Sequence, residues 1–283
     1  REIIAADFRD RVVEHLLFNE LAPIFERKFI HDSYSCRMGK GVHFGIDRAR
    51  GFLRAVSDDF RHEAWVLKLD ISGYFMSICQ RTLYEQVQKV FPEVRSSAIR
   101  ELMDYIAYKI IFHNPMENAI FKSSKSSWNG LPRNKSMLNS VPGTGLPIGN
   151  VTSQLFGNVY LNPLDHYVKR DLHIKYYGRY VDDFFLMHKD REYLLRCMER
   201  IRFFLKERLN LTLHPRKWSM QRACHGFKFL GAYILPGRVY PNHRVESVFF
   251  RYRKSKNVTQ SGLDSYRGYF SHFDCYRRMV RNE

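Results

Sequence analysis

The sequence lacks the cysteine spacing of a zinc site or a disulfide framework. It has five cysteines, an odd number, and none of them forms a CxxC pair. This usage is typical of free thiols in a reducing compartment. No apolar run approaches the roughly 20 residues of a membrane span, and the charged N-terminus lacks the apolar stretch of a signal peptide. We therefore expect a cytoplasmic protein without membrane contact.

A phosphate-binding loop of the nucleoside triphosphatase kind is also missing. Gly143-Thr144-Gly145 is rich in glycine, but no Gly-Lys-Ser/Thr follows it, which excludes that class. Low complexity is excluded as well, because 45% of the residues are hydrophobic and 15% are aromatic. The 283 residues fit one composite domain with several lobes around a shared core.

Negative charge is scarce. Lys and Arg number 46 against 29 Asp and Glu, which gives a formal net charge of +17. Such a field attracts polyanions, and nucleic acid is the leading partner. A basic surface that only keeps the protein soluble is the alternative, and charge alone does not decide between them.

The apolar pattern predicts mixed helices and strands. We expect helices over 7–29, over 83–112 with a break at Phe91-Pro92, over 151–172 and over 192–209. A strand is expected over 64–71, two more over 175–187 with a hinge at Asp182-Asp183, and a strand pair near 227–240. Residues 113–143 are rich in Ser, Asn, Lys, Gly and Pro, so they form a basic loop that either contacts nucleic acid or is simply mobile.

Three aspartates are the candidate catalytic residues. Asp182 and Asp183 are adjacent at the expected hinge, and Asp70 ends a strand in a distant segment. Transfer of a nucleotide needs two divalent cations roughly 4 Å apart, held by carboxylates. Hard oxygen ligands suit Mg²⁺. Adjacent aspartates also occur in ordinary turns, so this pair is not decisive by itself.

The residues after Asp70 suit a nucleotide site. The chain is expected to turn into a helix, so that backbone N–H groups near Gly73 and Tyr74 face an incoming triphosphate. Gly73 lets the backbone approach closely. Phe75 can stack beneath the sugar and block a 2′-hydroxyl, which favours deoxynucleotides, although an ordinary core aromatic is an equal interpretation.

With these segments in view, the chain resembles the reverse transcriptases, and most closely the bacterial, group II intron-like enzymes. The likeness runs through nearly the whole sequence in the order of that family. Seven segments carry it: Phe8–Val13 and Ser33–Gly41 (fingers motifs), Lys68–Ile78 (motif A), Gly145–Gln154 (motif B), Tyr180–Asp183 (the YxDD motif C), Leu211–Lys217 (motif D) and Phe229–Gly231 (the primer-grip motif E).

The resemblance implies an α+β right-hand polymerase fold, with an antiparallel palm sheet that has helices on one face and with a short helical thumb. The expected parts are fingers over 1–63, whose N-terminal portion we expect to be missing because the chain does not begin with Met, palm over 64–112 and 144–240, the basic loop 113–143, and thumb over 241–283. The implied partners are template RNA, cDNA primer and product, and deoxynucleotides.

The resemblance also implies roles for individual residues. Asp70, Asp182 and Asp183 would hold two Mg²⁺ ions, with Mn²⁺ as a substitute, assisted by the Ile71 carbonyl. Lys217 would protonate the departing pyrophosphate, with a plain surface lysine as the alternative. The remaining residues would bind nucleotide (Gly73, Tyr74, Phe75, Ile148, Gly149, Arg37, Lys40 and Arg1) or grip the primer (Phe229, Leu230 and Gly231).

Motif B points to one branch of the family. Most relatives have Gln where Ile148 stands and Ser-Pro where Ser153-Gln154 stands. The form found here resembles the reverse transcriptases of diversity-generating retroelements, which copy a template-repeat RNA with errors opposite adenine, rewrite a variable gene, and act with a small basic accessory protein. Because Ile offers only apolar contact, where Gln can hydrogen-bond, misplaced base pairs are penalised less; loop packing is the alternative role of Ile148.

Other members of the family stay open at this point. A group II intron maturase, a retron enzyme or a CRISPR-associated reverse transcriptase is the alternative within the class, although no HNH-type nuclease with paired cysteines is present. About fifty residues follow motif E, too few for a ribonuclease H domain. A catalytically silent RNA-binding protein on the same fold is the alternative from another class.

Overall fold

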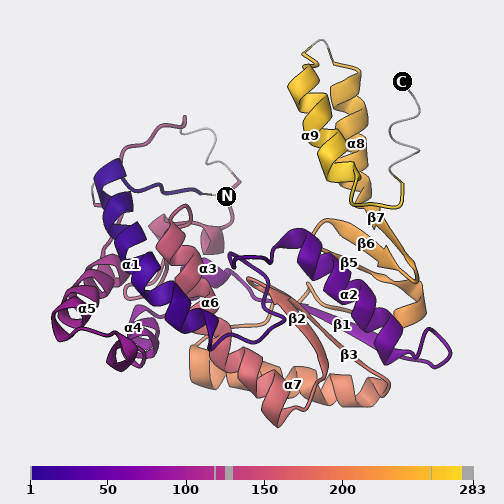
Figure 1. Ribbon diagram of the computed structural model, residues 1–283, viewed down its shortest axis with the longest axis horizontal. Helices are drawn as coiled ribbons and strands as arrows, with labels where there is room; N and C mark the ends of the chain where they lie inside the picture. Colours follow the sequence, from indigo (N-terminus) through magenta and orange to yellow (C-terminus); the bar gives the residue numbers. More distant parts are fainter. Residues whose placement is uncertain (1, 118, 125–129, 256, 276–283) are drawn as a thin grey trace.

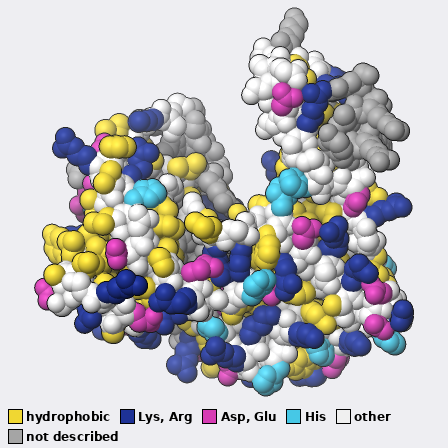
Figure 2. Space-filling model, in the orientation of Figure 1, with side chains coloured by type: hydrophobic (Ala, Val, Ile, Leu, Met, Phe, Trp, Pro, Cys, Tyr) yellow, Lys and Arg dark blue, Asp and Glu magenta, His cyan; other side chains and the backbone are white. Residues whose placement is uncertain are grey.

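The computed structural model describes residues 2–117, 119–124, 130–255 and 257–275. Figure 1 shows a helical lobe built around α1, α4 and α5, a sheet region beside it, and a pair of helices, α8 and α9, that rises from the far end of the sheet region. Figure 2 shows open space between the helical lobe and the α8–α9 pair. None of the described helices is long and apolar enough to cross a lipid bilayer.

The central sheet has four antiparallel strands in the order β2-β3-β1-β4. The two middle strands, WVLKLD and DFFLMH, are apolar, with β-branched and aromatic residues that suit a strand buried on both faces. The strands are β1 (Trp65–Asp70), β2 (Tyr176–Tyr180), β3 (Asp183–His188) and β4 (Ser219–Arg222).

Both faces of this sheet are covered. Leu67 and Leu69 of β1 point into a core shared with α6 (Val151–His166) and α7 (Arg191–Leu209). Val66 points the other way, into a core shared with α2 (Val42–Val56) and a second sheet. The expectation of helices on one face is therefore met by α6 and α7. It was incomplete, because α2 packs on the opposite face (Figure 1).

The helical lobe follows the apolar pattern of the sequence. α1 (Phe8–Glu26) packs on α6, while α4 (Gln80–Gln88) and α5 (Ser97–Phe112) are separated by a 3₁₀ turn over Phe91–Glu93, where Pro92 was expected to break the helix. After Asp70 the helix α3 (Tyr74–Ser77) is a single turn. α6 continues into a π-helical turn over Tyr167–Asp171, which completes the helix expected to end near Leu172.

Within 113–143, the described residues form only two 3₁₀ turns, Arg133–Lys135 and Met137–Asn139, in agreement with the composition. The segment nevertheless returns to the body of the protein. The Met137 N–H donates to the Glu2 carboxylate over 3.1 Å, and Thr144 forms a bridge with Cys79. The described part of this loop is therefore anchored beside the palm.

The strand pair expected near 227–240 is a three-stranded meander. β5 (Phe227–Phe229), β6 (Ala232–Leu235) and β7 (Arg238–Pro241) follow one another, because Pro236-Gly237, with Gly237 at φ +71°, supplies a second tight turn. α8 (His243–Arg253) and α9 (Gln260–Phe270) then pack through aromatic rings, with Phe249 and Phe270 centred 5.0 Å apart.

Candidate active site

Strand pairing brings two of the three aspartates together. Asp70, at the end of β1, is the partner of Asp183, at the start of β3. Residues directly opposed across antiparallel strands project to the same face of the sheet. Asp182 lies in the turn before β3, after Val181, whose φ is +56°. A β-branched residue in the left-handed region is strained, and such strain is typical of functional turns.

Two lysines pair with these carboxylates. The Lys68 ammonium lies 3.0 Å from Asp183 Oδ2, and the Lys217 ammonium lies 3.1 Å from Asp70 Oδ2. Lys68 precedes Asp70 by two residues, so strand alternation places both on one face. The sequence interpretation missed Lys68 as a residue of this site. Its position two residues before Asp70 on one strand was the available signal.

The segment after α7 brings Lys217 beside Asp70. It runs antiparallel to the end of β1, with a bridge between Ile71 and Leu213. The His214 N–H donates to the Asp70 carbonyl over 2.8 Å, and the Ser72 N–H donates to the Thr212 carbonyl over 2.9 Å. These hydrogen bonds fix the motif D segment beside the catalytic strand.

The carboxylates interact electrostatically. Burial raises the pKa of Asp183 to about 6, Lys68 opposes this shift, and the charges of Asp70 and Asp182 add to it. One oxygen of Asp183, Oδ1, is buried and accepts no hydrogen bond from the described residues. The cluster therefore has an unused oxygen ligand and an excess of negative charge.

The donor set suits a hard divalent cation, but its present arrangement does not enclose one. Within the described ranges, no three His, Cys, Asp or Glu side chains are placed to hold a single metal ion. Carboxylate oxygens are the ligands that Mg²⁺ prefers. Lys68 and Lys217 each contact one carboxylate oxygen, Oδ2 of Asp183 and Oδ2 of Asp70, so a metal ion would compete with these ammonium groups for the same oxygens.

The turn after Asp70 is packed against the 113–143 loop. Gly73 has φ +55°, and a Cβ there would lie 2.7 Å from the main-chain oxygen of Asn134. Asn134 also donates to the Ser72 hydroxyl over 3.3 Å. The basic loop thus reaches the turn that follows Asp70, a contact that its composition did not signal.

Tyr74 was expected to face the nucleotide through its backbone, and its side chain lies in the core. Its side chain is buried and its hydroxyl donates to the Gly157 carbonyl in α6, so only its backbone is free to face a nucleotide. Phe75 is half-buried beside the same glycine, where a Cβ would lie 3.3 Å from its ring. The Leu146 N–H donates to the Phe75 carbonyl over 2.8 Å, so Phe75 lies between motifs A and B.

The motif B loop is held by the N-terminal segment. The Ile4 N–H donates to the Ile148 carbonyl over 2.8 Å, and the Ala6 N–H donates to the Asn150 side chain over 3.1 Å. Gly149 has φ +139°, and a Cβ there would lie 2.9 Å from the Ile4 carbonyl oxygen. Ile148 itself is half-buried.

The two fingers cations proposed for the triphosphate are engaged elsewhere. The Arg37 side chain is only 4% exposed and donates to both oxygens of Glu26 and to two backbone carbonyls, so it cannot reach a triphosphate without breaking these bonds. Lys40 donates to the His31 carbonyl. Both side chains therefore bond neighbouring residues in this structure, and triphosphate binding by either stays a prediction. Arg1 lies outside the described residues.

The primer-grip residues form the turn between β5 and β6. Phe229 is buried and stacks edge-on against Phe185 of the palm, with the ring centres 4.9 Å apart, so its side chain belongs to the core. Leu230 and Gly231 both have positive φ, at +50° and +80°. The Gly231 carbonyl accepts from the N–H of Asn242 at the start of α8, over 2.7 Å. The turn therefore links the palm to the α8–α9 pair.

Arg179 is a further residue that the sequence interpretation missed. It is fully buried, and two of its nitrogens bond the two Asp165 oxygens over 2.7 and 2.6 Å. A third bond, of 3.0 Å, runs to the Val181 carbonyl in the catalytic turn. Burial alone would lower the pKa of Arg179, but the Asp165 carboxylate holds it above its ordinary value. A charged residue inside an otherwise apolar strand was the available signal.

A palm-like sheet with carboxylates at a hairpin and on the strand beside it defines the class of nucleic-acid polymerases. A family model described as reverse transcriptase (RNA-dependent DNA polymerase) matches residues 1–234. The chain belongs to this family.

Known relatives agree at the level of the fold. Protein YkfC of Escherichia coli (strain K12) is 24% identical over 290 residues, which cover 89% of this chain and 68% of that protein. Telomerase structures from Candida tropicalis, apo and in complex with a fragment of telomeric RNA, both align with a TM-score of 0.57 at 13% identity. These alignments cover 95% and 91% of this chain but only 44% and 40% of the telomerase chains, so the chain spans less than half of their length.

Proposed function

We propose that the chain extends a DNA primer on an RNA template, with Asp70, Asp182 and Asp183 as the catalytic carboxylates. The observation that carries this proposal is the pairing of Asp70 with Asp183 across β1 and β3, beside the turn that presents Asp182. Family membership supports the same reaction. The parts that contribute are fingers (1–63), palm (64–112 and 144–240), the loop 113–143, and thumb (241–283).

Asp70, Asp182, Asp183 and the Ile71 carbonyl would hold two Mg²⁺ ions, or Mn²⁺ in their place. When bound, these ions activate the primer hydroxyl and stabilise the charge on the departing pyrophosphate. Lys217, whose ammonium lies 3.1 Å from Asp70 Oδ2, would donate a proton to that pyrophosphate. Lys68 balances the charge of Asp183.

The substrate residues follow from their positions. Phe75, between motifs A and B, would exclude a 2′-hydroxyl and so select deoxynucleotides. The backbone at Gly73 and the loop at Ile148 and Gly149 would contact the nucleotide, and the Leu230-Gly231 turn would position the primer end.

Primer extension by the purified chain tests this function. With Mg²⁺ and an annealed RNA template, we expect incorporation of deoxynucleotides and little of ribonucleotides, and Phe75→Val should raise ribonucleotide use. Phe121→Val, at an exposed position in the loop, is the control. Absence of any templated incorporation would contradict the assignment.

We further propose that the enzyme belongs to a diversity-generating retroelement. It would copy a template-repeat RNA with errors at adenine, together with a small basic accessory protein. Support comes from the Ile148–Gln154 loop, where the half-buried Ile148 offers no hydrogen bond from its side chain.

The predicted consequence is that Ile148→Gln lowers misincorporation opposite template adenine. Ile148→Val, which keeps an apolar side chain, should leave the error spectrum unchanged. Sequencing cDNA made on one RNA by the wild type and both variants measures this. Identical spectra for all three enzymes would remove Ile148 as the determinant.

A further inference from the structure

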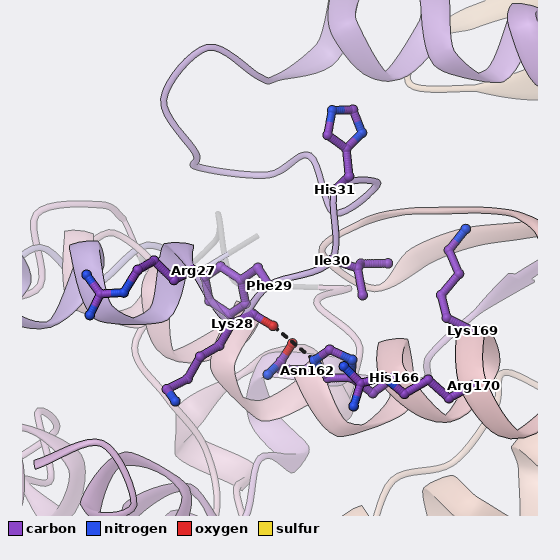
Figure 3. A pocket seen from close by; sticks show the side chains of 9 residues that line it. All are labelled: Arg27, Lys28, Phe29, Ile30, His31, Asn162, His166, Lys169 and Arg170. Carbon is purple, nitrogen blue, oxygen red and sulfur yellow. Dashed lines mark hydrogen bonds between the residues drawn. The ribbon is translucent and has the colours of Figure 1, made fainter. Parts of the chain in front are cut away.

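A basic cavity lies away from the catalytic aspartates. It has a volume of about 660 Å³, is open to solvent, and is lined by the loop after α1 and by the end of α6 with its π-helical turn (Figure 3). Cationic and histidine side chains dominate its lining: Arg27, Lys28, His31, His166, Lys169 and Arg170. Two segments more than a hundred residues apart thus build one positively charged hollow.

Few carboxylates neutralise this cavity. Glu93 contacts Lys28 at 2.6 Å and Arg27 at 3.5 Å, so one carboxylate pairs with two cations. Lys169 donates to the Lys175 carbonyl and lies 4.0 Å from Asp32, and burial lowers the pKa of its ammonium. Arg170 is exposed. The cavity therefore retains net positive charge, which suits phosphate groups.

The floor of the cavity carries a polar group without a partner. The side-chain oxygen of Asn162 is buried and accepts no hydrogen bond from the described residues. His166 Nε2 lies 2.9 Å from the Lys28 carbonyl, which fixes the ring at the edge of the cavity (Figure 3). The Asn162 side chain lines the cavity, so a rotation that turns its oxygen toward a ligand would let it accept from a ribose 2′-hydroxyl, a donor that deoxyribose lacks.

The cavity lies at the opposite end of α6 from the motif B loop. α6 begins beside that loop, and its 16 residues lead to the cavity at its other end. At 1.5 Å per residue this is a distance of about 24 Å from the motif B loop. A nucleic acid bound here therefore continues beyond the residues expected to contact the incoming nucleotide at motif B.

We propose that this cavity binds the phosphodiester backbone of the template RNA outside the region being copied. The assignment rests on the proposed function for the identity of the RNA. An alternative is that the basic residues only stabilise the carboxyl ends of α1 and α6, where helix dipoles favour cations. That alternative predicts an effect on stability and none on RNA affinity.

The test measures RNA affinity by fluorescence anisotropy in the absence of nucleotides. The probe is a single-stranded RNA long enough to span both sites, with DNA of the same sequence and a short primer–template as comparisons. The variant is Arg27→Ala/Arg170→Ala, which removes two exposed cations from the cavity. The matched control is Arg81→Ala/Arg202→Ala, which removes two exposed cations from α4 and α7.

We expect the cavity variant to weaken binding of the long RNA by about 10-fold. The slope of log affinity against log salt concentration should become shallower by about one. Binding of the short primer–template should be unchanged, and the control should bind the long RNA as the wild type does. Arg170→Ala alone should show a smaller effect of the same kind, which keeps the test valid if the double variant folds poorly.

Three results would overturn the proposal. If the cavity variant and the control lose the same RNA affinity, the effect is one of net charge alone. If the cavity variant loses the same affinity for DNA as for RNA, the site does not select RNA. If its RNA affinity is unchanged, the cavity is not a binding site. Because binding is measured without nucleotides, a failure of polymerase activity does not affect this result, and the two proposals fail separately.

Discussion

At the scale of single residues, the catalytic centre is a balance of charge. Three carboxylates face two ammonium groups, and each lysine occupies an oxygen that a metal ion would use. Lys68 lies on the rigid strand β1, while Lys217 comes from the segment after α7 and is 55% exposed. Lys217 is therefore the side chain with more freedom to leave its aspartate and act on a leaving group.

Replacing Lys217 tests this role. Lys217→Met should lower the rate of nucleotide incorporation by about 100-fold, since general acid catalysis contributes on that order. The Mg²⁺ concentration at half-maximal rate should not rise, because a cation that competes for Asp70 has been removed. Lys206→Met, on the exposed side of α7, is the control. A higher Mg²⁺ requirement with an unchanged maximal rate would contradict the assignment.

Arg179 connects stability with catalysis. Arg179→Met leaves Asp165 buried without its partner and should cost about 3–5 kcal/mol of unfolding free energy, measured with urea. Arg179→Lys keeps the charge but cannot donate to both Asp165 oxygens and to Val181 together. It should remain folded and lose kcat with little change in the KM for nucleotide. A Lys variant with full kcat would show that Arg179 does not position the catalytic turn.

The sequence was informative about these residues to different degrees. Adjacent or motif-spaced residues marked the three aspartates and Lys217 as candidates, and the Lys217 ammonium lies 3.1 Å from Asp70 Oδ2. The bonds of Arg37 to Glu26 and of Lys40 to His31 could not be predicted, because spacing does not encode such local pairing. Arg179 was missed because a partner 14 residues away becomes adjacent only after folding.

At the scale of elements, periodicity predicted most helices and both catalytic strands. α1, α6 and α7 begin and end close to where apolar spacing placed them. α1 and α7 each bury one stripe, whereas α6 is buried on nearly all sides. The third strand of the β5–β7 sheet was missed because four-residue strands carry little pattern. The pairing of Ile4 with Ile148 is a long-range contact, which no local pattern encodes.

Glu14 links α1 to motif B and makes stability depend on pH. It is buried, and burial raises its pKa above the ordinary 4.5, opposed by the nearby Thr152 hydroxyl and Arg11. Above pH 4.5 the unfolded chain therefore binds fewer protons at Glu14 than the folded chain does. The contribution of Glu14 to the free energy of unfolding falls as the pH rises.

Glu14→Gln should accordingly raise the unfolding free energy at neutral pH by about 1 kcal/mol. The gain should shrink as the pH falls toward the ordinary pKa of glutamate. Glu20→Gln, on the exposed side of the same helix, should show neither effect. Urea unfolding across this pH range measures both, and a gain that does not vary with pH would argue against a buried charge.

At the scale of the whole molecule, the lobes and the charge act together. The helical lobe and the α8–α9 pair stand apart from each other across open space (Figure 2), and the chain carries a net charge of +17. The central sheet carries Asp70 and Asp183 at the paired ends of its two middle strands. This arrangement allows a basic protein to hold a polyanion while a local cluster of negative charge binds divalent metal.

The most direct test is the single-turnover rate of one deoxynucleotide addition on an RNA template with Mg²⁺. Asp182→Asn should lower this rate by about 1000-fold, a loss of several kcal/mol of transition-state stabilisation, while binding of the primer–template is retained. Asp171→Asn, at an exposed position before β2, should react at the wild-type rate. Equal rates for Asp182→Asn and the wild type would contradict the assignment of the catalytic centre.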